Sequence, residues 1–470
     1  MAREFRTLDK DLSRVTNAEH AIMQSARPLL RLGIALIFMV AASVTAASLF
    51  AGPSSISVVA AGMAVAAYLA LSIGANDVAN SLGPAVGAGA IGMTTGLLMV
   101  AVMEVCGAVI AGNAITATLT EGLVGNTLGQ GEATARMMLV ALLAAGTWIS
   151  FATWMNAPVS TTHSVVGAIA GAGLATFGTD AVNWPVLAKI AIGWVASPFI
   201  AGLIAAALLA LLRNRVLRRE DRTEAGRLWL PVLVALSFGL LGAVGALATH
   251  GLGPAAVVGI ALAAALPGWA YARIRIDRQI RAEKSAPLAM KELLALPLAT
   301  AAIVMGFAHG ANDTANIAAP LTIILEGNEM QAGTVRDALV LLVAGLGIAL
   351  GIVLFGRRLV HMVGSRITRL NPGRALCVSL TTAITVLGFS SLGLPVSTTH
   401  IAVGGVFGIG FYREWRDRQH PKSRAPLPYE ERRRRRLVRR SHVRTILGAW
   451  LITVPASAIL AATLVWIGGF

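Results

Sequence analysis

The chain contains the sequence Gly74-Ala75-Asn76-Asp77-Val78-Ala79-Asn80, followed by Pro84, and repeats it as Gly310-Ala311-Asn312-Asp313-Thr314-Ala315-Asn316, followed by Pro320. A second motif, Pro158-Val159-Ser160-Thr161-Thr162-His163, returns as Pro395-Val396-Ser397-Thr398-Thr399-His400. Gly310 follows Gly74 by 236 positions and Pro395 follows Pro158 by 237, so both motifs belong to one duplicated unit.

The composition indicates that this unit lies in a membrane. Of the 470 residues, 56% are hydrophobic and 13% are charged, whereas soluble domains contain about 25% charged residues. Apolar runs near the roughly 20 residues that span a bilayer lie at 30–50, 56–75, 91–112, 137–157, 186–212, 229–248, 254–272, 295–318, 337–357, 374–394 and 443–467. Two shorter runs, 160–173 and 397–410, follow the Ser-Thr-Thr-His motifs. We expect an all-α, polytopic membrane protein of about 12 segments.

The basic residues orient these segments. Of the 39 Lys and Arg residues, 35 lie in five connections, which are 1–29, 213–227, 273–291, 357–374 and 413–444. The positive-inside rule places these connections in the cytoplasm and the connections without Lys or Arg outside. The segment pair around Pro158 then begins and ends outside, whereas the pair around Pro395 begins and ends inside. The sequence therefore predicts two inverted repeats, the architecture of secondary transporters that work by alternating access.

The short apolar arms after His163 and His400 predict re-entrant helical hairpins whose tips carry Ser-Thr-Thr. Broken helices are expected at the Asn-Asp motifs, because Gly74 permits a break before the first motif and Pro84 enforces one after it. The predicted organisation is a cytoplasmic N-terminal tail (1–29), an extra transmembrane helix (30–55), the first inverted repeat (56–212), a basic loop with two linking transmembrane helices (213–291), the second inverted repeat (292–412), a basic cytoplasmic linker (413–444) and a last transmembrane helix (445–470).

The hairpin tips have the features of an anion site. Pro158 and Pro395 end one helix, and Ser160 and Ser397 are good N-caps for the next. The first backbone N–H groups of each following half-helix then lack helical partners and carry the positive end of the helix dipole. Two such tips that point inward from opposite faces suit a tetrahedral oxyanion. A capped helix start without a ligand is the alternative for either copy alone.

The Asn-Asp motifs have the features of a cation site. On a helix, Asn76, Asp77 and Asn80 can point at one place, and so can Asn312, Asp313 and Asn316. A carboxylate and two carboxamides are hard oxygen ligands for a small cation. Asp77 and Asp313 are intramembrane ionisable residues, which makes a functional role the default expectation. A network of Asn and Asp side chains that joins helices without an ion is the alternative.

The four motifs together resemble those of the inorganic phosphate transporter (PiT) family, which couples phosphate uptake to sodium or protons. The resemblance covers nearly all of 56–470. It implies a phosphate site where the two repeats meet, with phosphate-binding residues Ser160, Thr161, Thr162, Ser397, Thr398, Thr399, Asn76 and Asn312. It implies cation-binding residues Asp77, Asn80, Asp313, Asn316, Asn76 and Asn312, with sodium at Asp77 and Asp313. It also implies a functional acidic residue in the helix after the first motif, which is Glu104 here.

Three histidines lie at the motifs. His163 and His400 are each the third residue of a half-helix, and we consider them, with Glu104, for coupling or gating. Either histidine could act as a neutral donor or as a proton carrier. His309 precedes Gly310 but has Ile73 as its counterpart in the first repeat, so it breaks the symmetry and is the weaker candidate.

These inferences together predict a cation-coupled phosphate symporter in the plasma (inner) membrane, with a cytoplasmic N-terminus, no cofactor, and sodium favoured over the proton as coupling ion. A sulfate permease of the same family and an intramembrane hydrolase are the alternatives. The arginine cluster from Arg432 to Arg440 is interpreted as a topology determinant that meets anionic lipid headgroups, with no nucleic-acid partner. A homodimer is left open by the sequence.

Overall fold

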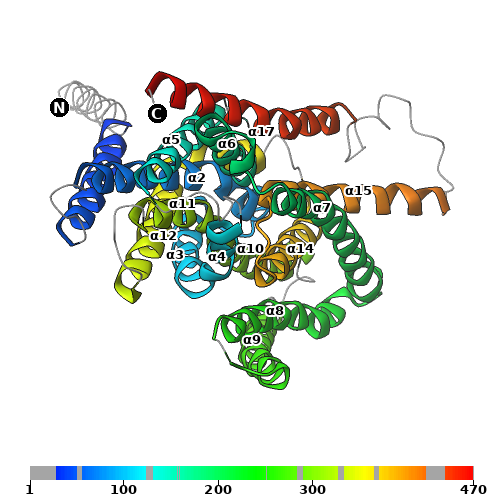
Figure 1. Cartoon of the computed structure of the whole chain (residues 1–470). Helices are drawn as coiled ribbons and strands as arrows, with labels where there is room; N and C mark the ends of the chain where they lie inside the picture. Colours follow the sequence, from blue (N-terminus) through cyan, green and yellow to red (C-terminus); the bar gives the residue numbers. More distant parts are fainter. Residues whose placement is uncertain are drawn as a thin grey trace, which may run out of the picture.

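The computed structural model describes residues 28–49, 56–122, 131–155, 157, 159–249, 251–282, 289–326, 333–364, 370–419 and 440–468. These residues form helices and no strands, as predicted (Figure 1). The N-terminal tail through residue 27 and the arginine-rich stretch 420–439 lie outside them. Eleven of the described helices are long and apolar enough to cross a membrane, and each falls on one of the eleven long apolar runs of the sequence.

The described helices follow one another along the chain in this order. The first candidate span is Pro28–Leu49. It is followed by α2 (Ile56–Gly87), α3 (Met93–Ala111), α4 (Asn113–Gly122), α5 (Glu132–Trp154), α6 (Thr161–Phe177), η1 (Thr179–Ala181), α7 (Trp184–Leu212), η2 (Arg213–Leu217), α8 (Arg222–Ala248), α9 (Pro254–Ala282), α10 (Met290–Asp313), α11 (Ala315–Glu326), α12 (Thr334–Phe355), α13 (Arg357–Met362), α14 (Pro372–Ser391), α15 (Thr398–Gln419) and α17 (Arg440–Gly468).

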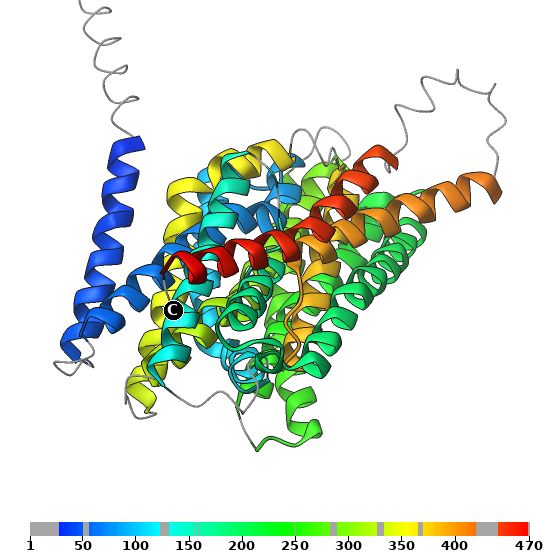
Figure 2. The same cartoon turned by 45° about the horizontal axis from the view of Figure 1, so that its top comes forward.

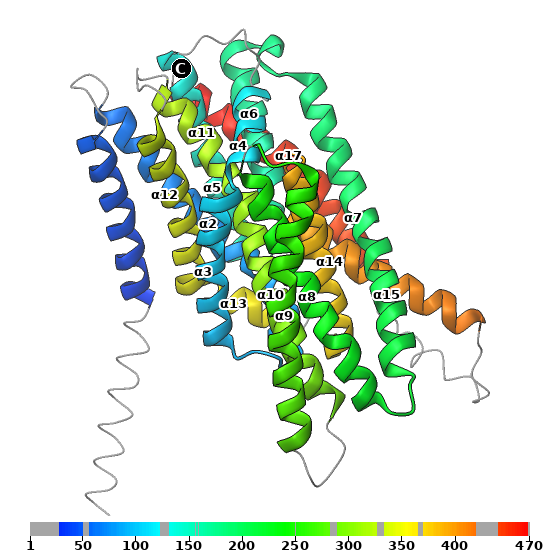
Figure 3. The ribbon, with the colours of Figure 1, turned by 90° about the horizontal axis from the view of Figure 1, so that it is seen from below.

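Two hairpins correspond to the two Ser-Thr-Thr-His motifs. α5 packs against α6, and α14 packs against α15. The chain turns between Trp154 and Thr161 in the first hairpin and between Ser391 and Thr398 in the second. The predicted hairpin connectivity is present, although α15 continues to Gln419, into the stretch that the sequence analysis assigned to a polar linker. Figures 2 and 3 show this end of α15 extending beyond the rest of the bundle.

The two repeats are interlocked through crossings at glycine. α2 packs on α12, and α10 packs on α3. A Cβ atom at Gly74 would lie 2.0 Å from the carbonyl oxygen of Ile348, and one at Gly310 would lie 2.1 Å from that of Glu104. Because any other residue carries that Cβ atom, only glycine allows the backbones to approach so closely. Each crossing therefore joins a motif helix of one repeat to a helix of the other.

The second arm of each hairpin crosses another helix at glycine in the same way. α6 packs on α17, and α15 packs on α7. A Cβ atom at Gly171 would lie 2.2 Å from the carbonyl oxygen of Ala458, and one at Gly408 would lie 2.0 Å from that of Gly202. Gly171 and Gly408 hold equivalent places, 237 positions apart. The structure thus relates the repeats pairwise, while their opposite orientation in the membrane stays a prediction.

The predicted breaks beside the first Asn-Asp motif are wrong. α2 runs through Gly74 and Pro84 without interruption, since Gly74 provides room for α12 and the packed helix tolerates the proline. In the second repeat α10 and α11 are separated only at Thr314, whose backbone keeps helical angles (φ −56°, ψ −36°), and Pro320 lies inside α11. A proline inside a helix removes one hydrogen bond without necessarily ending the helix, and surrounding helices offset that loss.

The peripheral helices pack loosely on this core. α8 and α9 form a pair at one edge of the molecule, and the helix Pro28–Leu49 lies at another (Figures 1 and 3). In the most apolar stretch of α10–α11, 72% of the residues are buried, whereas 11% are buried in that of α9. Many apolar side chains of α9 thus lie exposed on the outside of the bundle, whereas the motif helices are enclosed by other helices.

Candidate functional site

Both hairpin tips have the predicted N-cap. The Ser160 hydroxyl accepts a hydrogen bond from the backbone N–H of His163 at 3.2 Å, and the Ser397 hydroxyl accepts one from that of His400 at 3.3 Å. Each serine hydroxyl still has its own hydrogen to donate. Ser160 and Ser397 are 1% and 2% exposed. The helices that they cap, α6 of 17 residues and α15 of 22 residues, therefore begin inside the protein.

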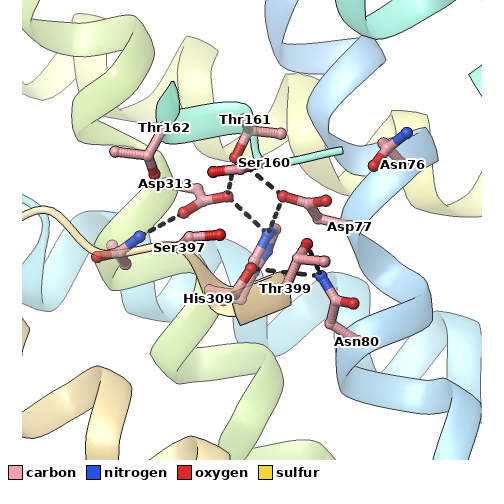
Figure 4. A network of polar contacts seen from close by, with 12 residues as sticks. Asn76, Asp77, Asn80, Ser160, Thr161, Thr162, His309, Asp313, Ser397 and Thr399 are labelled. Atoms are coloured by element: carbon pink, nitrogen blue, oxygen red, sulfur yellow. Dashed lines mark hydrogen bonds and ion pairs between the residues drawn. The ribbon is translucent and has the colours of Figure 1, made fainter. Parts of the chain in front are cut away.

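Each Asn-Asp motif contacts the hairpin of the opposite repeat. The amide of Asn80 donates to the Thr399 hydroxyl at 2.8 Å, and the amide of Asn316 donates to the Thr162 hydroxyl at 3.4 Å. Figure 4 shows Asn80 directly beside Thr399. Since Asn80 is equivalent to Asn316 and Thr399 to Thr162, the two bonds are the same contact made twice.

The two tips also bind each other. The Thr162 hydroxyl donates to the carbonyl of Val396 at 3.1 Å, and the Thr399 hydroxyl donates to the carbonyl of Val159 at 3.5 Å. These contacts again form an equivalent pair. The sequence-predicted residues of both tips and both motifs are therefore gathered at one buried centre.

The two aspartates converge at this centre. The Thr161 hydroxyl lies 2.9 Å from Oδ2 of Asp77 and 3.0 Å from Oδ2 of Asp313 (Figure 4). A hydroxyl has one hydrogen, so it donates to one carboxylate at a time. Both aspartates are almost fully buried. Carboxylate oxygens of the two aspartates lie within 4.8 Å of each other, and two like unit charges about 4 Å apart repel by about 4 kcal/mol at an effective dielectric constant of about 20. The pair therefore requires a cation or a proton.

Three oxygen atoms at the motifs are available for a cation. Oδ1 of Asn76, Oδ1 of Asp77 and Oδ1 of Asn316 are buried and accept no hydrogen bond from the described residues. Buried polar atoms are nearly always paired, so three orphaned acceptors in two equivalent motifs need an explanation. Carboxylate and carboxamide oxygens suit a hard cation such as sodium. The donor set thus fits the predicted ion chemically.

The prolines in the motif helices add to this oxygen set. A proline has no N–H and cannot donate to the carbonyl four residues earlier in its helix. Pro84 therefore leaves the carbonyl of Asn80 without its usual helical donor, and Pro320 does the same for Asn316. The prolines free one backbone acceptor at the same place in each repeat, without the helix break that the sequence predicted.

Asn312 and its counterpart Asn76 form different hydrogen bonds. Its amide group donates to the carbonyl of Val396 at 2.8 Å and to Asp313, and its own oxygen accepts from the backbone N–H of Val396 at 3.2 Å. The equivalent Asn76 donates to the Thr153 hydroxyl at 2.8 Å. In this conformation Asn312 holds the second hairpin tip, and its predicted part in binding phosphate and cation stays a prediction.

His309 lies beside both aspartates, although its lack of a counterpart made it the weaker candidate in the sequence. Its Nε2 is 2.9 Å from Oδ2 of Asp313 and 3.6 Å from Oδ2 of Asp77, and its Nδ1 is 2.7 Å from Oε1 of Glu104. Both ring nitrogens face carboxylate oxygens, whereas a neutral imidazole donates from only one nitrogen. The imidazole ring therefore lies between the carboxylate of Glu104 and those of the two aspartates. A signal was present in the sequence, since His309 precedes Asp313 by four residues on one helix.

The Glu104–His309 pair has no counterpart in the first repeat. It lies at the crossing of α3 and α10. At the equivalent crossing of α2 and α12, Ile73 takes the place of His309 and Ile348 that of Glu104, and both isoleucines are fully buried in the apolar core. The structure thus brings Glu104 into the site through His309, and the two otherwise matched repeats differ in charge.

The hairpin histidines lie apart from the aspartates. The rings of His163 and His400 meet edge to face with centroids 4.4 Å apart, and the ring of His163 also lies 3.9 Å from that of Trp194. The ring nitrogens of His163 form no hydrogen bond with the described residues. These contacts place both histidines between the hairpins, and their coupling or gating role stays a prediction.

Known proteins resemble the chain over most of its length. A sequence model of the phosphate transporter family matches residues 73–461. A putative phosphate permease of Helicobacter pylori is 37% identical, over 86% of this chain and 78% of the permease. The chloroplastic inorganic phosphate transporter 2-1 of Arabidopsis thaliana is 32% identical, over 85% of this chain and 70% of that protein. A solved structure titled "The sodium-dependent phosphate transporter" has a TM-score of 0.78 and 32% identity, and covers 87% of this chain and 98% of its own.

Proposed function

The chain belongs to the phosphate transporter family, and we propose that it takes up inorganic phosphate by symport with a cation, with sodium favoured over the proton. The family and the structural neighbour are transporters and not enzymes, which sets aside the intramembrane hydrolase. The observation that carries the proposal is the reciprocal contact of each Asn-Asp motif with the opposite hairpin, Asn80 with Thr399 and Asn316 with Thr162.

Phosphate binds between the two helix N-termini in this mechanism. The backbone N–H groups at the starts of α6 and α15 and the hydroxyls of Ser160, Thr161, Thr162, Ser397, Thr398 and Thr399 donate to its oxygens. The free Oδ1 of Asp77 can accept a hydrogen bond from the hydroxyl of a hydrogen phosphate. Sulfate has no such proton, so this acceptor favours phosphate over sulfate.

The charge of the site couples phosphate to the cation. Phosphate would enter a buried centre that already contains Asp77 and Asp313, and each negative charge about 4 Å from another costs about 4 kcal/mol at an effective dielectric constant of about 20. Sodium ions held by the oxygens of Asn76, Asp77 and Asn316 would remove this repulsion. Neither ion then binds well alone, and that mutual dependence makes the transporter a symporter.

The arrangement of the two hairpins supports a mechanism of alternating access. The site residues of α6 and α15 are buried, so neither face of the membrane reaches them in this conformation. We infer that one repeat rocks against the other about the His163–His400 contact and exposes the site to one side at a time. The plasma (inner) membrane and a cytoplasmic N-terminus are part of the same proposal.

Phosphate uptake into proteoliposomes tests the proposal. Labelled phosphate is supplied with an inward sodium gradient at constant pH, and in parallel with a pH gradient in the absence of sodium. We expect accumulation with sodium alone, and competition by unlabelled phosphate that exceeds competition by sulfate. Accumulation driven only by the pH gradient would reject sodium coupling, and equal competition by sulfate would reject phosphate selectivity.

A further inference from the structure

An arginine-lined cleft lies at the end of the bundle to which the basic connections belong. It encloses about 330 Å³ between the end of α7 with η2, the start of α14 and the distal part of α15. Five arginines line it, which are Arg213, Arg218, Arg374, Arg413 and Arg416, together with Asn371. None of the motif residues takes part. The cleft is therefore a second polar site, separate from the transport centre.

The cleft has a large excess of positive charge. Within the described residues Arg416 pairs with Asp417 at 2.6 Å, and no carboxylate pairs with Arg213, Arg218, Arg374 or Arg413. Four guanidinium groups that face one cavity repel one another unless an anion lies between them. Arginine presents a planar set of donors that matches the oxygens of a phosphate group.

A helix N-terminus adds to this field. Asn371 caps α14, a helix of 20 residues, by accepting from the backbone N–H of Arg374 at 3.0 Å, and it also accepts from Nε of Arg374 at 2.9 Å. Asn371 and Gly373 both line the cleft, so the positive end of the α14 dipole faces the same space as the arginines. Fixed dipole and side-chain charges thus favour an anion together.

The cleft lies at the depth of lipid headgroups. Arg213 follows Trp184 by 29 residues, or about 44 Å of helix at about 1.5 Å per residue, whereas the hydrocarbon core is about 30 Å thick. On α15, Phe411 and Trp415 are 59% and 56% exposed beside Arg413 and Arg416. Exposed aromatic residues of this kind gather at the membrane interface. The same helix thus presents apolar rings to acyl chains and guanidinium groups to phosphates.

We propose that the cleft binds the phosphate headgroup of an acidic phospholipid, which braces the ends of α7, α14 and α15. α15 begins with Thr398 and Thr399 at the transport centre and passes the cleft near its other end. The bound lipid therefore fixes the base of the second hairpin. The shared chemistry is a phosphate group, which a free phosphate of the cytoplasm could also supply, and the experiment separates these two sources.

The test uses the full chain in zwitterionic detergent micelles. Bound lipid is counted by native mass spectrometry, and the unfolding temperature is measured with phosphatidylglycerol, with phosphatidylcholine, or with inorganic phosphate or pyrophosphate and no lipid. The cleft variant is Arg213→Gln, Arg374→Gln and Arg413→Gln combined. The control variant combines Arg275→Gln, Arg278→Gln and Arg281→Gln, which removes the same charge from exposed positions of α9.

We expect the wild type and the control to retain phosphatidylglycerol in preference to phosphatidylcholine, and the cleft variant to bind it roughly tenfold or more weakly. Equal retention of both lipids by the wild type, or equal binding by cleft and control variants, would overturn the proposal. The proposal would also be overturned if free phosphate stabilised the wild type more than the cleft variant while phosphatidylglycerol stabilised neither. If the triple variant does not fold, Arg413→Gln alone, on the distal part of α15, gives the same comparison.

Discussion

The imidazole rings of His163 and His400 touch edge to face with centroids 4.4 Å apart, although 237 residues separate them along the chain. They hold the same position in the two copies of one motif. A residue can touch its own repeat equivalent only where the two repeats approach the axis that relates them. The contact therefore marks the place where the two repeats meet, between the two hairpins.

Substitution of either motif aspartate should stop coupled uptake. Asp77→Asn and Asp313→Asn each remove a charge that the coupling cation offsets, so we expect sodium-driven phosphate uptake to fall by roughly a hundredfold, about 2.7 kcal/mol. Asp180→Asn, in the exposed turn after α6, is the control and should keep wild-type uptake. Uptake is measured in proteoliposomes at equal protein content. Wild-type sodium dependence in Asp77→Asn would contradict the proposed cation site.

The two reciprocal contacts should have equal weight. Asn80→Ala and Asn316→Ala each remove an amide that donates to a threonine hydroxyl of the opposite hairpin. We expect each change to weaken the apparent affinity for phosphate by about tenfold, because a buried hydrogen-bonding group that loses its partner costs about 1–3 kcal/mol. Double-mutant cycles with Thr399→Val and Thr162→Val measure the coupling of each pair. Strong coupling in one pair and none in the other would contradict the equivalence of the two contacts.

The Glu104–His309 pair should serve function at a cost in stability. Glu104→Ile or His309→Ile alone leaves a buried charged or polar group without its partner, which destabilises by about 3–5 kcal/mol. The double variant reproduces the Ile73 and Ile348 pattern of the other crossing and leaves neither Glu104 nor His309 unpaired, so we expect its unfolding temperature to exceed that of both single variants. Its phosphate uptake should remain lost. Recovered uptake in the double variant would show that the pair is only structural.

The glycine crossings should tolerate no side chain. Gly74→Ala and Gly310→Ala place a Cβ atom about 2 Å from a backbone carbonyl oxygen of the crossing helix, so the helices must separate. We expect each change to lower the unfolding temperature measured in detergent. Gly245→Ala on α8, where nothing lies within 4 Å of the new atom, is the control and should be neutral or stabilising by about 0.5–1 kcal/mol. Equal effects at all three positions would contradict close packing as the cause.

The predicted inversion of the repeats can be tested by labelling. In a chain with Cys106 and Cys377 replaced by serine, we introduce Asp180→Cys after α6 or Asp417→Cys near the end of α15, both exposed positions. A membrane-impermeant thiol reagent added to intact cells should label position 180 and not position 417. Labelling of both positions from one side would rule out opposite orientations.

Much of the site could be predicted from the sequence because its signals are local. Ser160 and Ser397 were expected to cap helices, and both do so. The long apolar runs located all eleven candidate spans, since a run of about 20 apolar residues is typical of a membrane-spanning helix. The duplication of the motifs then indicated that both copies serve one centre, and the contacts of Asn80 and Asn316 are consistent with that.

The parts that could not be predicted depend on contacts between distant segments. Glu104 and His309 are 205 residues apart, and no spacing or periodicity indicates that they meet. Symmetry pointed away from His309, because its counterpart is Ile73. The unbroken helix through Pro84 could not be predicted for a similar reason. Whether a proline ends a helix or only frees a carbonyl depends on the helices packed around it.

The packing of α6 on α17 has a consequence for biosynthesis. Gly171 on the first hairpin crosses Ala458, which the ribosome adds almost 290 residues later. The first hairpin can pack on α2 through α5 as the chain is inserted, but α6 obtains its packing partner α17 only with the final segment. A protein shortened by that last helix would enter the bilayer and still present an unfinished first half to quality-control proteases.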